Sequence, residues 1–404
     1  MFVKWFHRKK DNFLLWGLLL FALFPIIPNN LKGLPVIFLL LVSLIKYTKT
    51  KALWSDFIVN ASLYLVFLLS LIYTENFGYA LKKMETMLSI IILPLVFFVL
   101  IPKHEILKET KVKFAKVFIV SSAIFSLLVF LSFFLDNSTV FYQNWYANKF
   151  RVVVTDMIAI GQHPIYASIF LSISVIFYVQ LIKTKNLKSI SSQMFFGFLT
   201  VLNVVLMMIL LSKGVLIALG ITLVFSLVKH QKNIKFMRLG ILVIIASFLL
   251  LFIFNRRMGE LLVPEVYKEV NPNFSTSIRI GVYKCSLEKI SENWLFGYGL
   301  GDSQIALNSC YEKKSNYLLA NEFNTHSQYL DILLKTGVLG LLVFLFFLLS
   351  NLRRASSANN QVAFMIILFY GLVFLTENIL SRQSGVILFY FLLLSFTRNG
   401  DENF

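Results

Sequence analysis

The sequence predicts an all-α polytopic membrane protein with about twelve transmembrane helices and one long hydrophilic loop between the ninth and the tenth. Hydrophobic residues make up 58% of the 404 residues, the mean hydropathy is +0.76, and only 14% of the residues are charged. A soluble protein of this length cannot bury so much apolar surface, whereas runs of apolar residues suit membrane spans. The 42 phenylalanines favour helices that face lipid.

Twelve apolar runs define the expected helices. One stretch, 194–228, would be about 50 Å long as a single helix, which is too long for one span. We therefore divide it at Ser212-Lys213-Gly214 and expect a tight turn there. The expected helices lie near residues 13–28, 34–46, 57–73, 85–101, 114–135, 165–182, 194–211, 214–228, 239–254, 329–350, 362–376 and 385–397.

The positive charges indicate how the chain is oriented in the membrane. The net charge of +18 is divided among short clusters between apolar runs, so it does not favour nucleic-acid binding. Lys and Arg are much more frequent in one alternate set of short connecting segments, which includes both termini, and this bias predicts that both termini are cytoplasmic. The basic start of the chain resembles a signal-peptide n-region, but no cleavage site is obvious, so we expect it to be retained.

The helices and the loop divide the chain into three parts. Residues 1–254 hold helices 1–9, residues 255–328 form the long outer loop, and residues 329–404 hold helices 10–12 and a cytoplasmic tail. Long loops without regular structure are uncommon unless they are functional. Within this loop, residues 277–293 predict an amphipathic helix with a partial apolar stripe at Ile280, Val282, Cys285, Leu287 and Ile290.

Two further features of the loop bear on its structure. Cys285 and Cys310 are the only two cysteines; they could pair in an oxidising compartment or remain free thiols, and the sequence leaves both open. The glycine-rich stretch 297–301 resembles a nucleotide-binding loop, but no strand precedes it and no Gly-Lys-Ser/Thr follows. A tight turn that requires small residues is favoured there.

His326 lies where the polar loop meets an apolar run. Thr325 and Gln328 have the spacing of a capping box, so a helix is expected to begin here with His326 at its first position. Unsatisfied backbone N–H groups disfavour a further positive charge at that position, and a neutral histidine can accept a proton. The alternative is a histidine that only decorates a polar helix start.

His163 and Lys213 also fall on the predicted outer side. His163 precedes Pro164, a helix start signal, and is either a functional group or a structural cap. Lys213 lies in the turn between two apolar helices. It is either a cation that faces a substrate anion or a lysine whose ammonium group reaches the membrane interface.

Arg279 and Glu377 complete the outer polar residues. The guanidinium of Arg279 could bind a phosphate through two parallel hydrogen bonds, or the residue could be an ordinary solvated loop arginine. Glu377 is either a functional acid or a local partner of Arg382 in the short turn between the last two helices.

The sequence shows no sign of a bound cofactor. The five histidines are scattered, and neither a metal-ligand spacing nor a Ser-His-Asp or Cys-His arrangement is visible. A neutral histidine with at least two cations at one membrane boundary suits the binding of a pyrophosphate and the deprotonation of a hydroxyl group.

Five stretches from residue 161 onward occur in an order typical of one family. They are GQHPIYAS at 161–168, LLSKGVLIALG at 210–220, SIRIGVYKCSLEKISENWLFGYGLGD at 277–302, THSQYLDILLKTGVLGLLVFL at 325–345 and TENILSRQSGVILFYFLLL at 376–394. Together they resemble the O-antigen ligase and O-antigen polymerase superfamily of bacterial envelope proteins. The first 150 residues match it only in hydropathy.

The resemblance implies transfer of a glycan from an undecaprenyl-pyrophosphate carrier to an acceptor hydroxyl at the periplasmic face of the bacterial inner membrane, without a metal. His326 matches the family's proposed base, and Arg279 matches one of two pyrophosphate-binding arginines. Lys213 stands where the second arginine is expected, and a lysine keeps the charge but loses the bidentate fork. The substrate-binding residues that we expect are Arg279, Lys213, His163, Glu377 and Tyr329.

The sequence leaves alternatives open for the acceptor substrate and for the functional class of the protein. A ligase would use a lipid A core or a similar glycolipid, whereas a polymerase would join carrier-linked repeat units. A membrane exporter of solutes or lipids would also have about twelve helices, but it predicts charges at the centres of helices and an internal repeat, and neither is visible.

Overall fold

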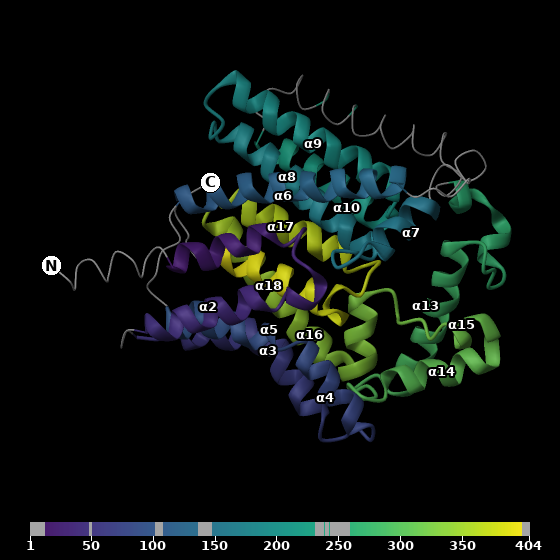
Figure 1. The fold of residues 1–404 in the computed structure, drawn as a ribbon. Coiled ribbons are helices and arrows are strands. Elements are labelled where there is room, and N and C mark those ends of the chain that lie inside the picture. Colours follow the sequence, from purple (N-terminus) through teal and green to yellow (C-terminus); the bar gives the residue numbers. More distant parts are fainter. Residues whose placement is uncertain are drawn as a thin grey trace.

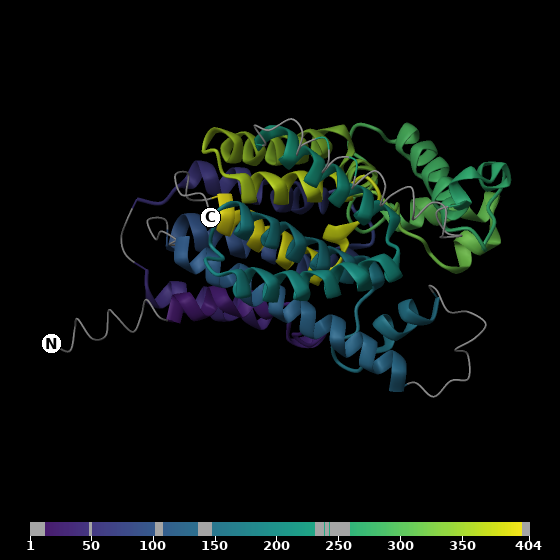
Figure 2. The same cartoon turned by 90° about the horizontal axis from the view of Figure 1, so that it is seen from above.

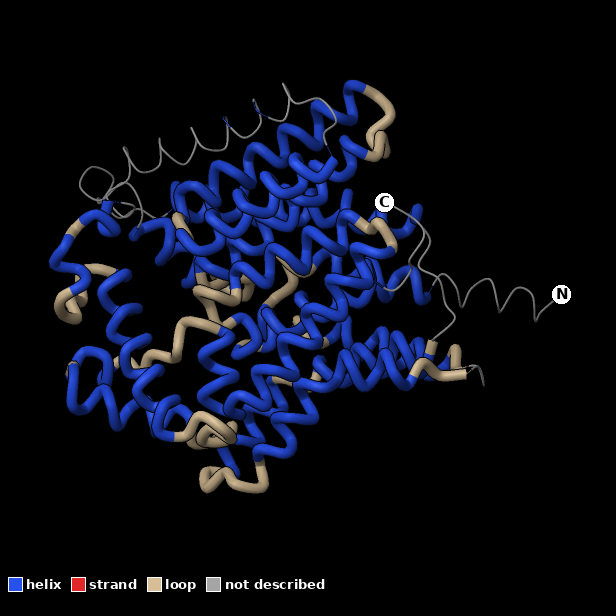
Figure 3. The backbone as a smooth tube through the Cα atoms, turned by 180° about the vertical axis from the view of Figure 1, so that it is seen from behind, coloured by secondary structure: helices blue, strands red, loops and turns tan. Residues whose placement is uncertain are grey.

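The computed structural model describes residues 13–47, 51–101, 108–135, 148–230 and 259–397, together with Arg238 and Leu242. These residues form helices joined by turns and irregular segments, and no strand occurs among them (Figure 3). The all-helical class expected from the sequence is confirmed. The expected helix at 239–254 lies outside the described residues.

Besides the short turns η1 (Phe21–Leu23) and η2 (Asn29–Leu31), the described part of the first half of the chain supplies an N-terminal helix and ten further elements. An apolar helix covers Phe13–Leu23, and a bent pair of helices replaces the single expected run at 85–101, with an angle of 43° between Phe77–Thr86 and Ser89–Leu100. The elements are α2 (Leu34–Ile45), α3 (Trp54–Ser70), α4 (Phe77–Thr86), α5 (Ser89–Pro94), the π-helical turn η3 (Leu95–Leu100), α6 (Lys108–Leu135), α7 (Asn148–Asp156), α8 (Pro164–Lys183), α9 (Ile190–Leu210) and α10 (Lys213–His230).

The turn expected at Ser212-Lys213-Gly214 is present. Helix α9 ends at Leu210, Leu211 takes a left-handed conformation with φ of 46°, and α10 begins at Lys213. A single left-handed residue ends a helix because its backbone cannot continue the right-handed path. The division of the long apolar stretch into two helices is therefore confirmed.

The second half of the chain supplies the outer helices and the final bundle helices. The expected amphipathic helix at 277–293 is α13, and Val282 and Cys285 are fully buried, whereas Leu287 is 55% exposed. The elements are η4 (Glu260–Leu262), η5 (Pro264–Tyr267), α13 (Ser275–Glu292), α14 (Ser303–Lys314), α15 (Asn316–Ala320), α16 (Gln328–Ser357), α17 (Gln361–Val373), η6 (Ile379–Ser381) and α18 (Gln383–Thr397).

The number of helices long enough to cross a membrane is smaller than twelve. Within the described residues, α6, α8, α9 and α16 are long and apolar enough, and the bent pair α4–η3 would make a fifth span. Six further apolar helices have 10–17 residues each. Some runs are shortened because irregular segments, such as 374–382 between α17 and α18, replace helix at one end of the bundle. Hydropathy does not separate such segments from helix, and their backbone polar groups are satisfied inside the protein.

The helices pack around a central aromatic core in which α18 is buried on all sides. Each of its residues from Gly385 to Thr397 is buried. The ring of Phe391 stacks on that of Phe21 at 3.7 Å, and Phe396 packs against Phe177 of α8 at 5.5 Å. Helix α9, by contrast, exposes large apolar side chains such as Phe198, as expected for a surface that faces lipid.

Connecting segments gather at two opposite ends of the bundle. At one end of α8, the Tyr166 hydroxyl donates to the carbonyl of Ile379 at 3.3 Å. At its other end, about 30 Å away along a 20-residue helix, Lys183 donates to the carbonyl of Ser226. Helices α13–α15 lie at one end of the bundle (Figures 1 and 2).

Helices α13–α15 form a small body with a core of its own. Its buried residues include Val282, Leu307 and Tyr311, and Leu334 of α16 joins the same cluster. The stretch expected to be a loop is thus largely helical. It is held against the bundle by apolar packing at the start of α16.

The glycine-rich stretch 297–301 is a turn that docks on a kink in α16. Gly337 interrupts this helix with φ of 64° and ψ of −168°, and a Cβ atom there would lie 2.0 Å from the backbone oxygen of Leu295, just before the turn. The N–H groups of Tyr298 and Gly299 donate to carbonyl oxygens of α16 at 2.9 Å each. The turn thus satisfies acceptors that the kink releases from the helix. The expectation of a tight turn is confirmed.

A disulfide joins Cys285 of α13 to Cys310 of α14, with their Cα atoms 5.7 Å apart. The pairing that the sequence left open is therefore present. Both residues are fully buried in the core of α13–α15. The bridge closes a loop of 25 residues.

Removing this disulfide should destabilise α13–α15 by about 3 kcal/mol, since cross-linking a loop of this length reduces the entropy of the unfolded chain by that order. The measurement compares thermal unfolding of Cys285→Ala/Cys310→Ala protein with that of the unaltered protein, each with and without reductant. Reductant should lower the midpoint of the unaltered protein only. A midpoint that neither reductant nor the double substitution changes would contradict a stabilising bridge.

Candidate functional site

His326 lies just before α16, and not at its first helical position as expected. The N-cap is Ser327, the helix begins at Gln328, and His326 has a left-handed backbone with φ of 48°. The expected capping box is wrong because Thr325 and Gln328 bond elsewhere. The Thr325 hydroxyl contacts the Asn378 side chain at 2.9–3.1 Å, and the Gln328 side-chain oxygen accepts the backbone N–H of Leu380 at 2.8 Å.

The imidazole of His326 is neutral near pH 7. Burial, the positive charge of Arg279 and the neighbouring His163 together lower its pKa to about 3, and burial is the largest of these causes. The expectation of a neutral histidine is confirmed, but its cause is burial and a nearby arginine, and not the start of a helix. Neither ring nitrogen has a hydrogen-bond partner in the part of the chain that the structure describes. The ring is therefore able to accept a proton from a bound molecule.

His163 is the N-cap of α8. Its Nδ1 accepts the backbone N–H of Ile165 at 3.4 Å, and Pro164 follows at the first helical position. Burial lowers the pKa of His163 to about 4, and the charges of Arg382, Arg151 and Arg279 act in the same direction. Because Nδ1 is the acceptor, the proton of the neutral ring is on Nε2, which makes His163 a hydrogen-bond donor toward a ligand.

Arg279, on the second turn of α13, connects the outer helices to the segment before α18. Its guanidinium pairs with the Glu377 carboxylate at 2.5 Å and donates to the carbonyl of Thr376. The pair is largely buried, with side-chain exposures of 27% and 7%. Burial raises the pKa of Glu377, and the charge of Arg279 opposes that shift.

The partner of Glu377 differs from the one that the sequence suggested. Arg382 lies over the ring of Tyr166, with its guanidinium carbon 5.7 Å from the ring centroid. Of the two alternatives that the sequence left open for Glu377, the local ion pair with Arg382 is therefore not formed. The carboxylate reaches Arg279, which lies 98 residues earlier in the chain.

Lys213 at the start of α10 faces the same region as Arg279. Its ammonium group contacts Glu260 at 2.8 Å and the Thr276 hydroxyl at 3.3 Å. Helix α10 comes close to the segment before α18 because its second residue is Gly214, where a Cβ atom would lie 2.1 Å from the Thr376 hydroxyl oxygen.

One cavity of about 290 Å³ lies between α10 and α13, and its lining includes neither His163 nor His326. The cavity brings together Lys213, Arg279 and Glu377, as expected, and adds two residues that the sequence analysis did not single out. Arg151 lines it and donates to the carbonyl of Leu210 at 2.6 Å. The lining also includes Tyr283, one helical turn after Arg279, a spacing that could have revealed it.

Tyr283 also connects the cavity to the candidate base. Its hydroxyl donates to the backbone carbonyl of His326 at 3.2 Å. Tyr329 lies apart from these residues: its hydroxyl donates to the carbonyl of Gly371 at 2.9 Å, and its ring packs on Phe344. A substrate-binding role for Tyr329 stays a prediction.

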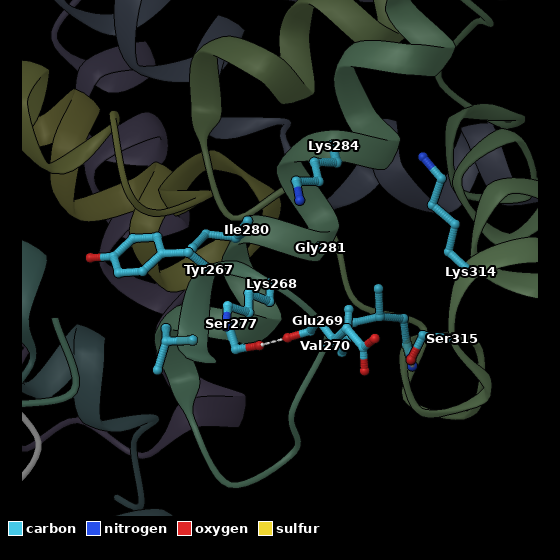
Figure 4. A pocket seen from close by; sticks show the side chains of 12 residues that line it. Tyr267, Lys268, Glu269, Val270, Ser277, Ile280, Gly281, Lys284, Lys314 and Ser315 are labelled. Atoms are coloured by element: carbon cyan, nitrogen blue, oxygen red, sulfur yellow. Dashed lines mark hydrogen bonds between the residues drawn. The ribbon is translucent and has the colours of Figure 1, made fainter. Parts of the chain in front are cut away.

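A separate cavity of about 380 Å³ lies on the outer helices (Figure 4). Lys268, Lys284 and Lys314 line it, and the Ser277 hydroxyl donates to the carbonyl of Glu269 beside them. None of His163, Lys213, Arg279 or His326 reaches it. In the described ranges, no group of three or more His, Cys, Asp or Glu side chains is arranged to hold a metal ion.

The fold and the cavity define a class of protein. A helical membrane protein that collects three cations near a neutral histidine at one end of its bundle is suited to bind an anionic group. Residues 198–345 match the family model described as O-antigen ligase, and this stretch contains Lys213, Arg279 and His326. The chain carries a domain of the O-antigen ligase and polymerase superfamily, whose members are glycosyltransferase-like ligases or polymerases. No curated protein matches the chain.

Proposed function

We propose that this protein is a glycan ligase that transfers a glycan from undecaprenyl pyrophosphate to a hydroxyl group of a lipid A core or a similar acceptor. The observation that carries the proposal is the cavity in which Lys213 and Arg279 lie together beside His326. Three cations and one carboxylate line this cavity, so its net charge attracts an anion. In the proposed orientation, the cavity faces the periplasm from the inner membrane, both termini are cytoplasmic, and the polyprenyl chain lies among membrane lipids.

The pyrophosphate of the donor would replace the carboxylates that now pair with the cations. Arg279 is held by Glu377 and Lys213 by Glu260, so both are already oriented toward acidic oxygens. A pyrophosphate presents the same kind of acceptor oxygen, and as a whole it carries more negative charge than one carboxylate, because each of its phosphates is ionised. Arg279 can bind it through two parallel hydrogen bonds, whereas Lys213 acts as a point charge.

The transfer then needs one base and one stabilised leaving group. His326 takes the proton of the acceptor hydroxyl, whose oxygen forms a bond to the anomeric carbon of the donor sugar. The bond between that carbon and the pyrophosphate oxygen breaks, and the electron pair leaves with the pyrophosphate. Arg279, Lys213 and Arg151 stabilise the charge that develops on it. Glu377 holds Arg279 in place until the donor binds, and His163 would orient the acceptor.

The donor would also prepare the base. The positive charge of Arg279 lowers the pKa of His326 in the free protein. A bound pyrophosphate neutralises that charge, and an anion nearby favours the protonated imidazole. The pKa of His326 therefore rises when the donor binds, and proton abstraction becomes more favourable in the complex that needs it.

A deletion strain separates ligase from polymerase. Loss of a ligase should leave free core glycolipid together with long carrier-linked polymer, because the polymer is made but not attached. Loss of a polymerase should instead leave core that bears single repeat units. Surface glycolipids separated on a gel distinguish these results. Unchanged glycolipids would contradict both and favour an exporter.

A further inference from the structure

A second polar cavity, of about 440 Å³, lies next to the cation cavity at the same end of the bundle. Its lining comes from the segment before α2, the segment before α8 and the start of α18. The two cavities share the first turn of α8, where Ile165 lines the first and His163 and Tyr166 line the second. His163 therefore lies between them.

Lys32 is a buried lysine in this second cavity, where burial lowers its pKa to about 7 and a bound anion would favour its charged form. Its side chain is 1% exposed, and its Nζ has no hydrogen-bond partner within the described residues. The ammonium group lies 5.1 and 5.3 Å from the ring centroids of Phe24 and Phe170. Such cation–π contacts offset part of the cost of burying a charge, but they do not replace the missing hydrogen bonds. An anion in the cavity would supply them.

Arg382 provides a second positive charge at the opening of the same cavity. It is exposed, and apart from its contact with the Tyr166 ring its side chain forms no hydrogen bond or ion pair with the described residues. No carboxylate is among the described residues that line this cavity. Lys213 and Arg279 each hold a glutamate, whereas no described carboxylate pairs with Lys32 or Arg382, so this cavity can accept the anion of a ligand.

The remaining lining is suited to a sugar. The side-chain amides of Asn29, Gln162 and Gln383 lie around the cavity and can donate to hydroxyl groups or accept from them. Asn29 and Gln162 are fixed before any ligand binds, since Gln162 donates to the Asn29 side chain and the backbone N–H of Asn29 donates to the carbonyl of Ala159 at 3.0 Å. A preformed set of amides with two cations fits a polar, acidic ligand.

We propose that this cavity binds an acidic sugar of the acceptor glycan, a sugar that bears a carboxylate or a phosphate group, with Lys32 and Arg382 as its charge partners. The inference rests on the proposed function in one respect: the donor pyrophosphate occupies the neighbouring cation cavity, so the second cavity receives the acceptor. The Nε2–H of His163 would donate to the acceptor sugar between the two sites.

Binding of simple sugars to the full-length protein in lipid nanodiscs tests this assignment. D-glucuronate carries a carboxylate, D-glucose 6-phosphate carries a phosphate, and D-glucose carries neither. At least one of the two acids should bind ten times or more tightly than D-glucose, and the acid that binds identifies the group. Lys32→Met and Arg382→Gln should each weaken that binding at least tenfold, whereas Lys82→Met, an exposed lysine of α4, should not.

Two results would overturn the assignment: D-glucose binding as tightly as both acids, or binding of the acids that neither substitution weakens. Arg382 is exposed, so Arg382→Gln remains informative if Lys32→Met fails to fold. The binding measurement needs no turnover and should be unaltered in His326→Ala protein. Protein that binds the acids but transfers no glycan would support the acidic-sugar site and overturn the proposed function. Protein that transfers glycan but does not bind the acids selectively would support the proposed function and overturn the acidic-sugar site.

Discussion

His326→Ala protein should lose glycan transfer by a factor of about 10² to 10⁴, the range over which a positioned general base contributes to rate. The substitution removes a neutral imidazole whose ring has no hydrogen-bond partner in the described part of the chain, so the fold should be little affected. Transfer is measured with purified protein, a carrier-linked donor and a core acceptor. Asn321→Ala, an exposed position five residues earlier, is the matched control.

The pH dependence provides an independent test of His326. Because burial and Arg279 hold its pKa near 3, and that of His163 near 4, both rings are already deprotonated at pH 5 in the free protein. kcat/KM for the donor reports the free protein, so it should stay level as the pH falls from 8 to 5. A histidine with an ordinary pKa would instead lose activity with a midpoint near 6.5. An unaltered rate in His326→Ala protein would exclude this residue as the base.

Arg279→Ala protein should show kcat/KM for the donor reduced by about 10² to 10³, as when one preorganised donor to a developing charge is removed. Arg279→Lys should recover only part of the loss, because lysine keeps the charge but cannot form two parallel hydrogen bonds. Lys284→Ala, on the same helix but lining the separate cavity in Figure 4, is the control. Equal donor use by the Arg279→Ala and Lys284→Ala proteins would contradict the assignment.

Lys213 gives the complementary comparison, since it stands where the family resemblance expects an arginine. Lys213→Ala should reduce donor use, because it removes a positive charge from the cavity between α10 and α13. Lys213→Arg should preserve donor use within a few-fold, because the site already pairs this side chain with a carboxylate at 2.8 Å and arginine forms the same kind of pair. A Lys213→Arg protein as defective as Lys213→Ala would mean that the shape of the lysine, and not its charge, matters.

The sequence predicts the helices well because apolar runs of helical length have few other solutions. It also places His163, Lys213, Arg279 and Glu377 at one end of the bundle. The number of spans was not predictable in the same way, since the apolar run at 362–376 continues past the end of α17 at Val373 into irregular backbone.

The contacts within the site could not be predicted from the sequence, because they join residues that are distant in the chain. Thr325 has the spacing of a capping box, yet its hydroxyl bonds to Asn378, 53 residues away. Glu260 and Lys213 are 47 residues apart, and no local pattern signals that pairing. In the sequence, Arg151 is one of several positive charges in a connecting segment, and only the fold shows that it lines the cavity.

The burial of α18 has a consequence for how the protein is made. This helix follows every other described helix in the chain, yet it occupies the middle of the bundle, where Phe391 packs on Phe21. The earlier helices therefore cannot complete their packing until α18 has been synthesised and inserted among them. The segment that supplies Glu377 and Arg382 directly precedes α18, so the binding cavities form only when this last helix has entered. An incompletely synthesised chain would be inserted in the membrane but inactive, and its open centre would be a ready target for quality-control proteases.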